Sequence, residues 1–388
     1  MSATIPYGRQ SIDESDLAAV ARVLESDWLT QGPAIPAFEA ALAQRAQAKH
    51  AVAVTNATAA LHIACLAAGL GPGDRLWTTP NTFVASANCA RYCGADVDFV
   101  DIDRRTWCLD AVALERKLAD AEQAGTLPKI VVPVAFAGRS ADMRAIKRLA
   151  DRYGFIVVED ASHAVGAAYE GRPVGCGDFA DMTVFSFHPV KIVTTGEGGA
   201  VLTNDDALHA RLSSLRSHGI TRDAAKMEGE SDGPWYYEML ELGFNYRMTD
   251  MQAALGVSQL ARLDAFLARR RALVRRYAAL LDGLPLVLPQ SDALDESAWH
   301  LYVVRLRLDA TPATHRQVFE RLRQAGIGVN LHYIPVHLQP YYRRLGFAPG
   351  QFPEAEQYYR EAISLPMYAG LTDEAQSIVA DELRKALR

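Results

Sequence analysis

Short runs of apolar and β-branched residues alternate with helical stretches along the first half of the chain. Near-continuous apolar strands separated by helices predict an α/β fold with a mostly parallel sheet covered on both faces. No helical pattern separates the last two runs, so we expect one of them to run antiparallel. The predicted strands are AVAVT (51–55), RLWTT (75–79), VDFVDID (97–103), KIVVPVAF (129–136), FIVVED (155–160), TVFSF (183–187) and GAVLTN (199–204), with helical patterns at 57–69, 82–94, 109–123 and 142–154.

The second half of the chain has a different pattern. Residues 251–281 keep apolar side chains at helical spacing across about eight turns, which predicts one long helix between two domains. From about Trp299, the strand patterns 300–308 and 328–333 mix with helical patterns at 315–326 and 373–387. Because 388 residues exceed one ordinary compact unit, we expect a large domain over 1–250 and, over 251–388, an interdomain helix with a smaller α+β domain.

Composition narrows the class of protein. Lys and Arg number 40 against 46 Asp and Glu, and the net charge of -6 favours neither nucleic acid nor an anionic membrane as a partner. The five cysteines form no C-x-x-C pair, so we expect no disulfide framework and no metal site, but buried apolar side chains in a reducing cytoplasm. The first ten residues hold no signal-peptide core, and no apolar run reaches the length of a membrane span.

Lys191 is the first candidate for chemistry. It stands between the apolar run MTVF and the turn TTGEGG, close to the end of a strand predicted to be buried. Ligands of open α/β sheets gather at the carboxyl ends of the strands. A lysine desolvated there has a lowered pKa and can attack an aldehyde as an amine nucleophile, although an isolated lysine at a turn is more often a surface residue.

Two carboxylates reach the same edge of the predicted sheet. The strand FIVV ends in Glu159 and Asp160, and adjacent strand residues point to opposite faces, so only one of them can face the site. Asp160, which precedes ASHAVGA, is either a helix cap or the carboxylate that keeps a pyridine nitrogen protonated. Pyridoxal phosphate requires such a carboxylate, because its protonated ring is the electron sink.

Three further residues would complete a cofactor site. TNATAALHIA passes directly from a strand into a helix N-terminus, which suits a phosphate, and Thr58 adds a hydroxyl there. Ser186 can donate to the same phosphate, and Phe83 either stacks on a flat ring or packs in the core. A lysine, a ring-nitrogen carboxylate, a phosphate cradle and an aromatic side chain are together what pyridoxal phosphate requires.

With these residues in place, the chain resembles the DegT-type nucleotide-sugar aminotransferases, a branch of the fold-type I pyridoxal phosphate enzymes. The resemblance implies a seven-stranded, mostly parallel sheet between helices in the large domain, an N-terminal segment covering the substrate, and a homodimer. Lys191 is not replaced by histidine, the change that marks the sugar 3-dehydratases of this family. The segments that carry the resemblance, in the family's order, are LTQGPAIPAFEAALAQ, AVAVTNATAALHIA, TTPNTFVASANCARYCGADVDFVDID, VVEDASHAVGA, FSFHPVKIVTTGEGGAVLTN and LGFNYRMTDMQAALGVSQLARLD.

The resemblance also implies roles for individual residues. Lys191 would bind the cofactor as a Schiff base, and Asp160 would pair with its pyridine nitrogen. His163 would lie near the ring hydroxyl, and Asn245 of GFNYR would reach the phosphate of the neighbouring subunit. The phosphate would be held by Ala57, Thr58 and Ser186.

A narrower likeness concerns the substrate. IPYGRQSIDESDL, FHPVKIVTTGEGG and NLHYIPVHLQPYY are similar to segments of the transaminases of pseudaminic acid biosynthesis. Those enzymes convert UDP-2-acetamido-2,6-dideoxy-β-L-arabino-hexos-4-ulose into its 4-amino sugar with L-glutamate as amino donor. The likeness implies that the segments containing Tyr7, Thr30, Gln31, His332 and Tyr333 line the sugar-nucleotide pocket, with ordinary loop or core packing as the alternative at each position.

Other functions stay open from the sequence alone. The substrate could be another 4-keto sugar nucleotide of the perosamine or bacillosamine type, or a 3-keto sugar nucleotide. A cofactor-bound regulatory protein without turnover is an alternative of a different class. His218 and Arg247 are further candidates for contacts with substrate anions, whereas we expect His50, His62 and His188 to be structural.

Overall fold

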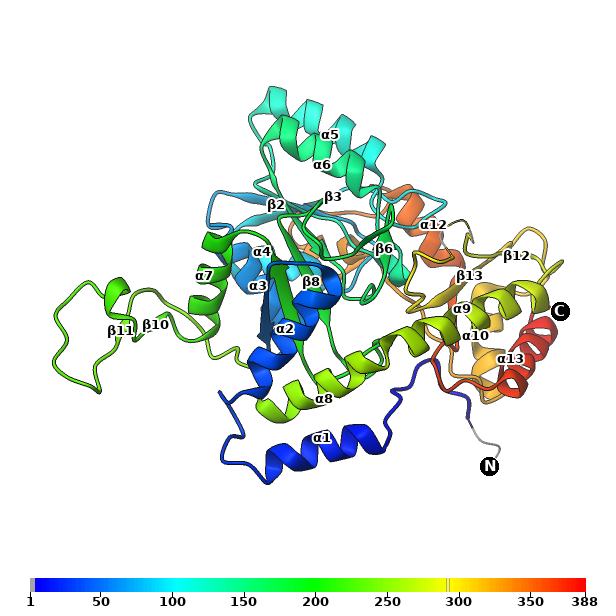
Figure 1. Cartoon of the computed structure of the whole chain (residues 1–388). Helices are drawn as coiled ribbons and strands as arrows, with labels where there is room; N and C mark the ends of the chain where they lie inside the picture. The colour runs from blue at the N-terminus through cyan, green and yellow to red at the C-terminus, as the bar shows by residue number, and fades with distance from the viewer. Residues whose placement is uncertain (1–3, 291, 293) are drawn as a thin grey trace.

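A seven-stranded sheet between helices forms the centre of the computed structural model, which describes residues 4–290, 292 and 294–388 (Figure 1). The strand order is β1-β9-β8-β5-β4-β2-β3, and β9 runs antiparallel to both of its neighbours while the other pairs are parallel. The predicted mostly parallel sheet is therefore confirmed. The strands are β1 (His50–Val54), β2 (Arg75–Thr78), β3 (Asp96–Phe99), β4 (Ile130–Val132), β5 (Ile156–Asp160), β8 (Met182–Ser186) and β9 (Gly199–Thr203).

Alternation along the strands divides the apolar side chains between two cores. On β1, Val52 and Val54 belong to the core that α3, α4 and α7 share, whereas Ala51 and Ala53 belong to a second core with α2 and α8. Helices α5 and α6 pack against each other beside the sheet (Figure 1). The helices are α2 (Ala34–Ala46), α3 (Ala57–Ala67), α4 (Ala85–Tyr92), α5 (Ala111–Ala124), α6 (Met143–Tyr153), α7 (Asp206–Arg216) and α8 (Asp250–Ala261).

The long helix predicted over 251–281 is two helices, α8 and α9 (Leu263–Leu280), which meet at Arg262. The backbone of Arg262 leaves helical geometry with φ -103° and ψ 2°. Its guanidinium binds the carboxylates of Asp13 and Asp16, beside α1 (Glu14–Leu24). The apolar spacing continues through this break because α8 and the first turns of α9 both contribute to the second core, through residues such as Ala253, Leu263 and Leu267, so the periodicity alone did not reveal it.

The C-terminal part contains a small antiparallel sheet of β12 (Leu286–Val287), β13 (Tyr302–Leu306) and β14 (Ala362–Leu365). The strand predicted over 328–333 is wrong, because that segment makes only an isolated bridge between Asn330 and Ser364. A third core lies among residues 273–387 and belongs to this C-terminal part. Helix α8, which the prediction assigned to the same part, packs instead on α1 and α2. A domain boundary at residue 250 therefore stays a prediction. The helices here are α10 (His315–Gln324), α11 (Pro340–Arg343), α12 (Pro353–Glu361) and α13 (Asp373–Ala386).

A two-stranded arm projects from the body of the molecule, far from the C-terminal sheet (Figure 1). It is built on β10 (Ile220–Thr221) and β11 (Glu238–Met239) and carries exposed apolar side chains such as Trp235 and Leu242. A second small hairpin pairs β6 (Ala168–Tyr169) with β7 (Arg172–Pro173). Short 3-10 turns lie at Phe136–Gly138, Ala224–Lys226 and Val336–Leu338.

The cysteines agree with the sequence prediction. All five are free thiols with buried side chains. Within the described ranges, no helix combines the length and apolar character needed to cross a membrane.

Candidate active site

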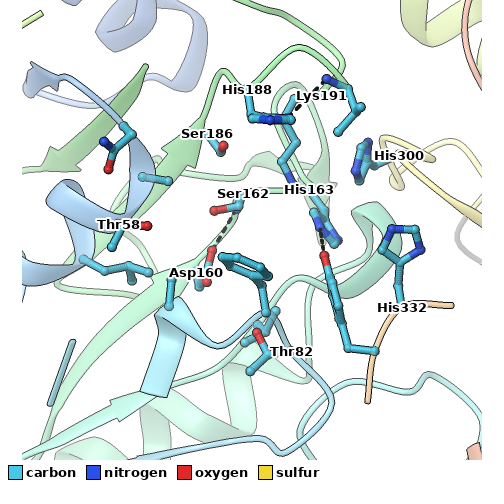
Figure 2. Close-up of a pocket in the computed structure, with 18 of the residues that line it drawn as sticks. Thr58, Thr82, Asp160, Ser162, His163, Ser186, His188, Lys191, His300 and His332 are labelled. Atoms are coloured by element: carbon cyan, nitrogen blue, oxygen red, sulfur yellow. Dashed lines mark hydrogen bonds between the residues drawn. The ribbon is translucent and has the colours of Figure 1, made fainter. Parts of the chain in front are cut away.

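A pocket of about 1010 Å³ opens at the carboxyl ends of β5 and β8 (Figure 2). This is the edge of the sheet where the sequence predicted the functional residues. Strand β5 delivers Asp160 and the parallel strand β8 delivers Ser186 to this pocket. Lys191 enters from the loop between β8 and β9, and Thr58 from the first turn of α3. The topology therefore gathers in one cavity four residues that lie up to 133 positions apart in the chain (191 against 58).

Lys191 is the amine of this cavity. Burial lowers the pKa of its side chain to about 8, and the negative charge of Asp160 opposes part of that shift. At pH 7.5 such an amine is neutral in about a quarter of the molecules, against about one in a thousand for an ordinary lysine. A neutral amine is the nucleophilic form, so the site prepares Lys191 to attack an aldehyde.

This lowered pKa predicts a pH profile for the capture of an aldehyde by the cofactor-free protein. Because the amine loses its proton as the pH rises through about 8, the rate of borohydride-stable labelling by pyridoxal phosphate should rise with a midpoint near that value. Stopped-flow absorbance at several pH values, with reduction and mass analysis of the product, measures the profile. A midpoint near 10.5 would mean that Lys191 is not desolvated.

Asp160 is the carboxylate of the cavity, and the residue is 5% exposed. Its Oδ2 accepts a hydrogen bond from Ser86 Oγ at 2.6 Å, and its Oδ1 accepts one from the Ser162 N–H at 3.1 Å. Glu159 lies outside the pocket lining and accepts a hydrogen bond from Ser140 Oγ at 2.9 Å, while burial raises the pKa of its carboxyl to about 7. The structure thus confirms that only one of the two carboxylates faces the site.

The N-terminus of α3 forms a cradle for an anion. The first N–H groups of a helix lack intrahelical acceptors, and here the side chain of the N-cap Asn56 accepts from the Ala59 N–H, at 2.9 Å. Ala57, Thr58 and Ser186 line the pocket beside them. These donors and the helix dipole suit a phosphate, as the sequence predicted.

Gly199 is the last glycine of TTGEGG, and the close approach of another segment explains it. A Cβ at this position would lie 2.5 Å from the carbonyl carbon of Asn56 and 2.6 Å from the Ala57 nitrogen, so β9 approaches the cradle as closely as its backbone allows. Any side chain at Gly199 must therefore displace the turn that opens α3.

We accordingly expect Gly199→Ala to weaken the affinity of the cofactor-free protein for pyridoxal phosphate by about 10- to 100-fold, the cost of overpacking a rigid contact. Absorbance titration with the cofactor measures this affinity. Gly71→Ala is the matched control, because a Cβ there would meet no atom within 4 Å. Equal affinities for both variants would show that the Gly199 contact does not hold the cradle.

Phe83 lies at the pocket and not in the core, with 57% of its surface exposed. The packing alternative considered for it is therefore wrong: Phe83 follows β2 at the open sheet edge, just before α4. Its ring centroid lies 6.2 Å from that of Tyr333 at an interplanar angle of 55°. An exposed aromatic face at the opening of a cavity can stack on a planar ligand.

Histidines form the wall beside Lys191. His163 and His332 line the pocket, and His163 Nε2 lies 3.1 Å from the hydroxyl oxygen of Tyr333. Burial and the positive charge of Lys191 lower the pKa of His332 to about 3. The neighbouring His300 also lines the cavity, its ring 4.4 Å from that of His163. Figure 2 shows these imidazoles and Lys191 directed into the same space.

The residues expected to line a sugar-nucleotide pocket separate into two groups. Tyr7, His332 and Tyr333 line the cavity, whereas Thr30 and Gln31 lie outside its lining and are exposed. The backbone of Thr30 pairs with Thr249. Asn245, His218 and Arg247 likewise lie outside the lining, and Asn245 is exposed and pairs with Ser217.

Sequence reasoning missed several residues of the pocket. His62 and His188, expected to be structural, both line it, whereas His50 binds Asp206 away from it, with 2.6 Å between Nε2 and Oδ1. Ser86 was also missed: it lies outside the pocket lining, in the first turn of α4, and acts only through its hydrogen bond to Asp160. Ser162 and Glu197 lie within the motifs around Asp160 and Lys191 and could have been suspected for that reason, whereas His300 and Asn330 had no signal because they come from a distant part of the chain.

Fold and pocket together define a class. The desolvated amine of Lys191, the buried carboxylate of Asp160, the cradle at α3 and the aromatic face of Phe83 fit pyridoxal phosphate in every part that this cofactor requires. The protein is a pyridoxal phosphate-dependent enzyme of the α/β type. More narrowly, the chain belongs to the DegT/DnrJ/EryC1/StrS aminotransferase family, whose sequence profile matches residues 10–384.

Individual relatives match nearly end to end. The spore coat polysaccharide biosynthesis protein SpsC of Bacillus subtilis is 38% identical over 387 residues, 99% of this chain and 97% of that protein. Helicobacter pylori PseC, described as an aminotransferase of pseudaminic acid biosynthesis, superposes with a TM-score of 0.90 at 31% identity and covers 99% of both chains. The PLP form of the sugar aminotransferase Spr1654 of Streptococcus pneumoniae superposes at 0.87 with 28% identity, covering 99% of this chain and 100% of the other.

Proposed function

We propose that the protein transfers the amino group of L-glutamate to UDP-2-acetamido-2,6-dideoxy-β-L-arabino-hexos-4-ulose and forms the UDP-4-amino sugar of pseudaminic acid biosynthesis. The full-length similarity to PseC of Helicobacter pylori carries the choice of sugar. The cavity of about 1010 Å³ supports it, because one site must admit both a small dicarboxylate and a large sugar nucleotide.

The chain's own residues divide the work of transamination. Bound pyridoxal phosphate supplies an electron sink for the charge that develops when a C–H bond of the substrate breaks. Lys191 would hold the cofactor through its side-chain amine and, once freed by glutamate, would act as the base that takes the proton leaving the glutamate Cα. Asp160 would hold a proton on the pyridine nitrogen, and the cradle at Ala57, Thr58 and Ser186 would bind the phosphate.

A homodimer is part of the proposal. Thr30, Gln31 and Asn245 lie outside their own pocket and are exposed, so a neighbouring subunit is where they would meet a ligand. The projecting arm presents apolar side chains, with Trp235 at 71% and Leu242 at 78% exposure, which suits burial against a second copy. Light scattering should give the mass of a dimer. A mixture of Lys191→Ala and Asn245→Ala chains should recover activity if sites are shared, and no recovery would argue against sharing.

The substrate assignment is tested with a panel of 4-keto and 3-keto sugar nucleotides supplied with L-glutamate, and with the products identified by NMR. The proposal requires a C4 amine from the L-arabino UDP substrate in preference to the others. A preference for a perosamine-type or bacillosamine-type 4-keto substrate, or for a 3-keto substrate, would replace the sugar while leaving the reaction class intact. A regulatory protein without turnover would show no absorbance change when mixed with glutamate, and Lys191 and Asp160 argue against this alternative.

A further inference from the structure

One line of hydrogen bonds runs along the histidine wall of the pocket. The backbone N–H of Ala137 donates to His163 Nδ1 at 3.2 Å, and His163 Nε2 lies 3.1 Å from the Tyr333 hydroxyl oxygen. A neutral imidazole has one donor and one acceptor nitrogen. Since Nδ1 accepts from a backbone donor, Nε2 carries the proton and donates to Tyr333.

The charge states of both rings agree with this assignment. Burial lowers the pKa of His163 well below its usual value, and the positive charge of Lys191 lowers it further, so the imidazole stays neutral. Burial and the negative charge of Asp160 raise the pKa of Tyr333, so its hydroxyl stays protonated. The Tyr333 oxygen therefore accepts from His163 while its own O–H is left to donate elsewhere.

The position of Tyr333 limits what that O–H can reach. Its ring lies beside Phe83 and Phe136, with centroids 6.2 Å and 6.3 Å away, and both its ring and that of His163 line the cavity that holds Lys191. Within residues 4–290, 292 and 294–388, His163 is the hydrogen-bond partner found for this hydroxyl. A donor with no protein acceptor, in a pocket that binds a carbonyl compound, is available to the substrate.

We propose that the Tyr333 hydroxyl donates a hydrogen bond to the carbonyl oxygen of the sugar carbon that is aminated, and that His163 is a positioning residue that fixes the direction of this donor. The inference rests on the proposed sugar transamination. When nitrogen adds to the carbonyl carbon, negative charge develops on the oxygen, and a preorganised donor stabilises it. Over the whole condensation, the C–O bond breaks and the oxygen leaves as water with both hydrogens of the attacking amine, so Tyr333 is not consumed.

Tyr333→Phe tests the donor directly. We expect the maximal single-turnover rate of the amino-loaded enzyme with the keto sugar to fall about 10²- to 10³-fold. The affinity of the cofactor-free protein for pyridoxal phosphate should change by less than about twofold, because Tyr333 is assigned to the substrate and not to the cofactor. Tyr169→Phe is the matched control: it also removes a hydroxyl hydrogen bond, to Asp142 at 3.0 Å, but outside this pocket.

His163 variants test the positioning role. His163→Gln keeps an acceptor and a donor and should retain most of the rate, whereas His163→Leu should lose about as much as Tyr333→Phe. The double variant His163→Leu with Tyr333→Phe should be no slower than Tyr333→Phe alone, because both changes remove one interaction. If the two changes acted through independent structural effects, the rate losses of the two single variants would instead multiply in the double variant.

Three results would overturn the inference. An unchanged rate for Tyr333→Phe would rule out the donor role of the Tyr333 hydroxyl, and the proposed sugar transamination would still stand. A loss of cofactor affinity in Tyr333→Phe would assign the hydroxyl to the cofactor, and multiplied losses in the double variant would remove the positioning role. If the unmodified protein aminates no keto sugar at all, the proposed function and the inference fall together.

Discussion

Lys191→Ala should abolish transamination, with a loss of about 10⁴-fold or more in the rate of both half-reactions. The change removes the amine that we propose holds the cofactor and, with it, the proposed base that moves the proton of the substrate. Burial keeps the pKa of Lys191 at about 8, and the Asp160 carboxylate lies in the same cavity. Stopped-flow absorbance with glutamate, and then with the keto sugar, measures the two half-reactions separately.

Two further variants separate the chemistry of Lys191 from its charge. Lys191→Arg keeps a cation but has no nucleophilic amine, so it should be as inactive as Lys191→Ala. Lys147→Ala, which removes a surface lysine bound to Asp151 on α6, should retain full activity. Activity in Lys191→Arg above about 1% of the unmodified protein would show that charge, and not nucleophilicity, is what this position contributes.

Asp160→Ala should lower the rate about 10²- to 10⁴-fold, the range found when a group that holds a catalytic proton is removed. The carboxylate is buried and is oriented by Ser86 and Ser162, so its negative charge keeps a proton on a ring nitrogen placed against it. Without it, the nitrogen loses its proton and the ring becomes a poorer electron sink. Steady-state turnover with glutamate and the keto sugar measures the loss.

A chemical rescue distinguishes this role from a structural one. A cofactor methylated on its ring nitrogen carries a permanent positive charge and needs no carboxylate, and alanine leaves room for the methyl group. N-methyl pyridoxal phosphate should therefore raise the activity of Asp160→Ala and do nothing for Lys191→Ala. If Asp160→Ala melts at a much lower temperature and the methylated cofactor does not restore its activity, then Asp160 stabilises the fold and does not keep the pyridine ring protonated.

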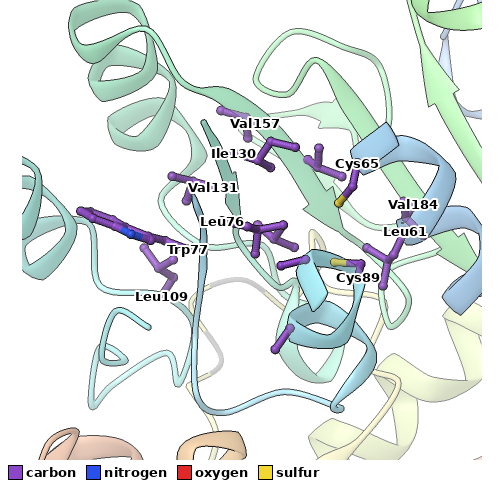
Figure 3. Packing of buried hydrophobic residues seen from close by; sticks show 14 of the residues in the cluster. Leu61, Cys65, Leu76, Trp77, Cys89, Leu109, Ile130, Val131, Val157 and Val184 are labelled. Carbon is purple, nitrogen blue, oxygen red and sulfur yellow. The ribbon is translucent and has the colours of Figure 1, made fainter. Parts of the chain in front are cut away.

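The central sheet could be predicted because its strands are nearly continuous apolar runs. Leu76, Ile130 and Val157 lie on three adjacent strands and pack in one core with Leu61 and Cys65 of α3 (Figure 3). Because both faces of these strands are buried, their sequences are apolar throughout and do not alternate with polar residues, which makes them easy to recognise as strands. The antiparallel direction of β9 followed from the missing helix between it and β8.

Elements whose stability depends on tertiary contacts were harder to predict. The break at Arg262 is invisible to periodicity because it depends on Asp13 and Asp16, which are 246 or more positions away. Residues 328–333 have the composition of a strand, but the segment pairs with β14 through a single bridge, between Asn330 and Ser364. The local sequence pattern indicates which segments can be buried, but it does not indicate which segments they contact.

The same distinction applies to the pocket. Lys191, Asp160 and the turn at Ala57 were predictable because each stands at the end of an apolar strand, where α/β enzymes bind ligands. His300 and Asn330 were not, because the sequence does not show that the C-terminal part folds back onto the end of β5. The hydrogen bond between His163 and Tyr333 spans 170 positions and likewise required the structure.

Borohydride reduction of the protein with bound pyridoxal phosphate, followed by peptide mass spectrometry, shows whether Lys191 binds the cofactor covalently. We expect one pyridoxyl phosphate mass addition per chain, on the peptide that contains Lys191, and its absence in Lys191→Arg. A label on another lysine, or a protein that binds the cofactor and takes up no label, would show that Lys191 is not the cofactor-binding amine.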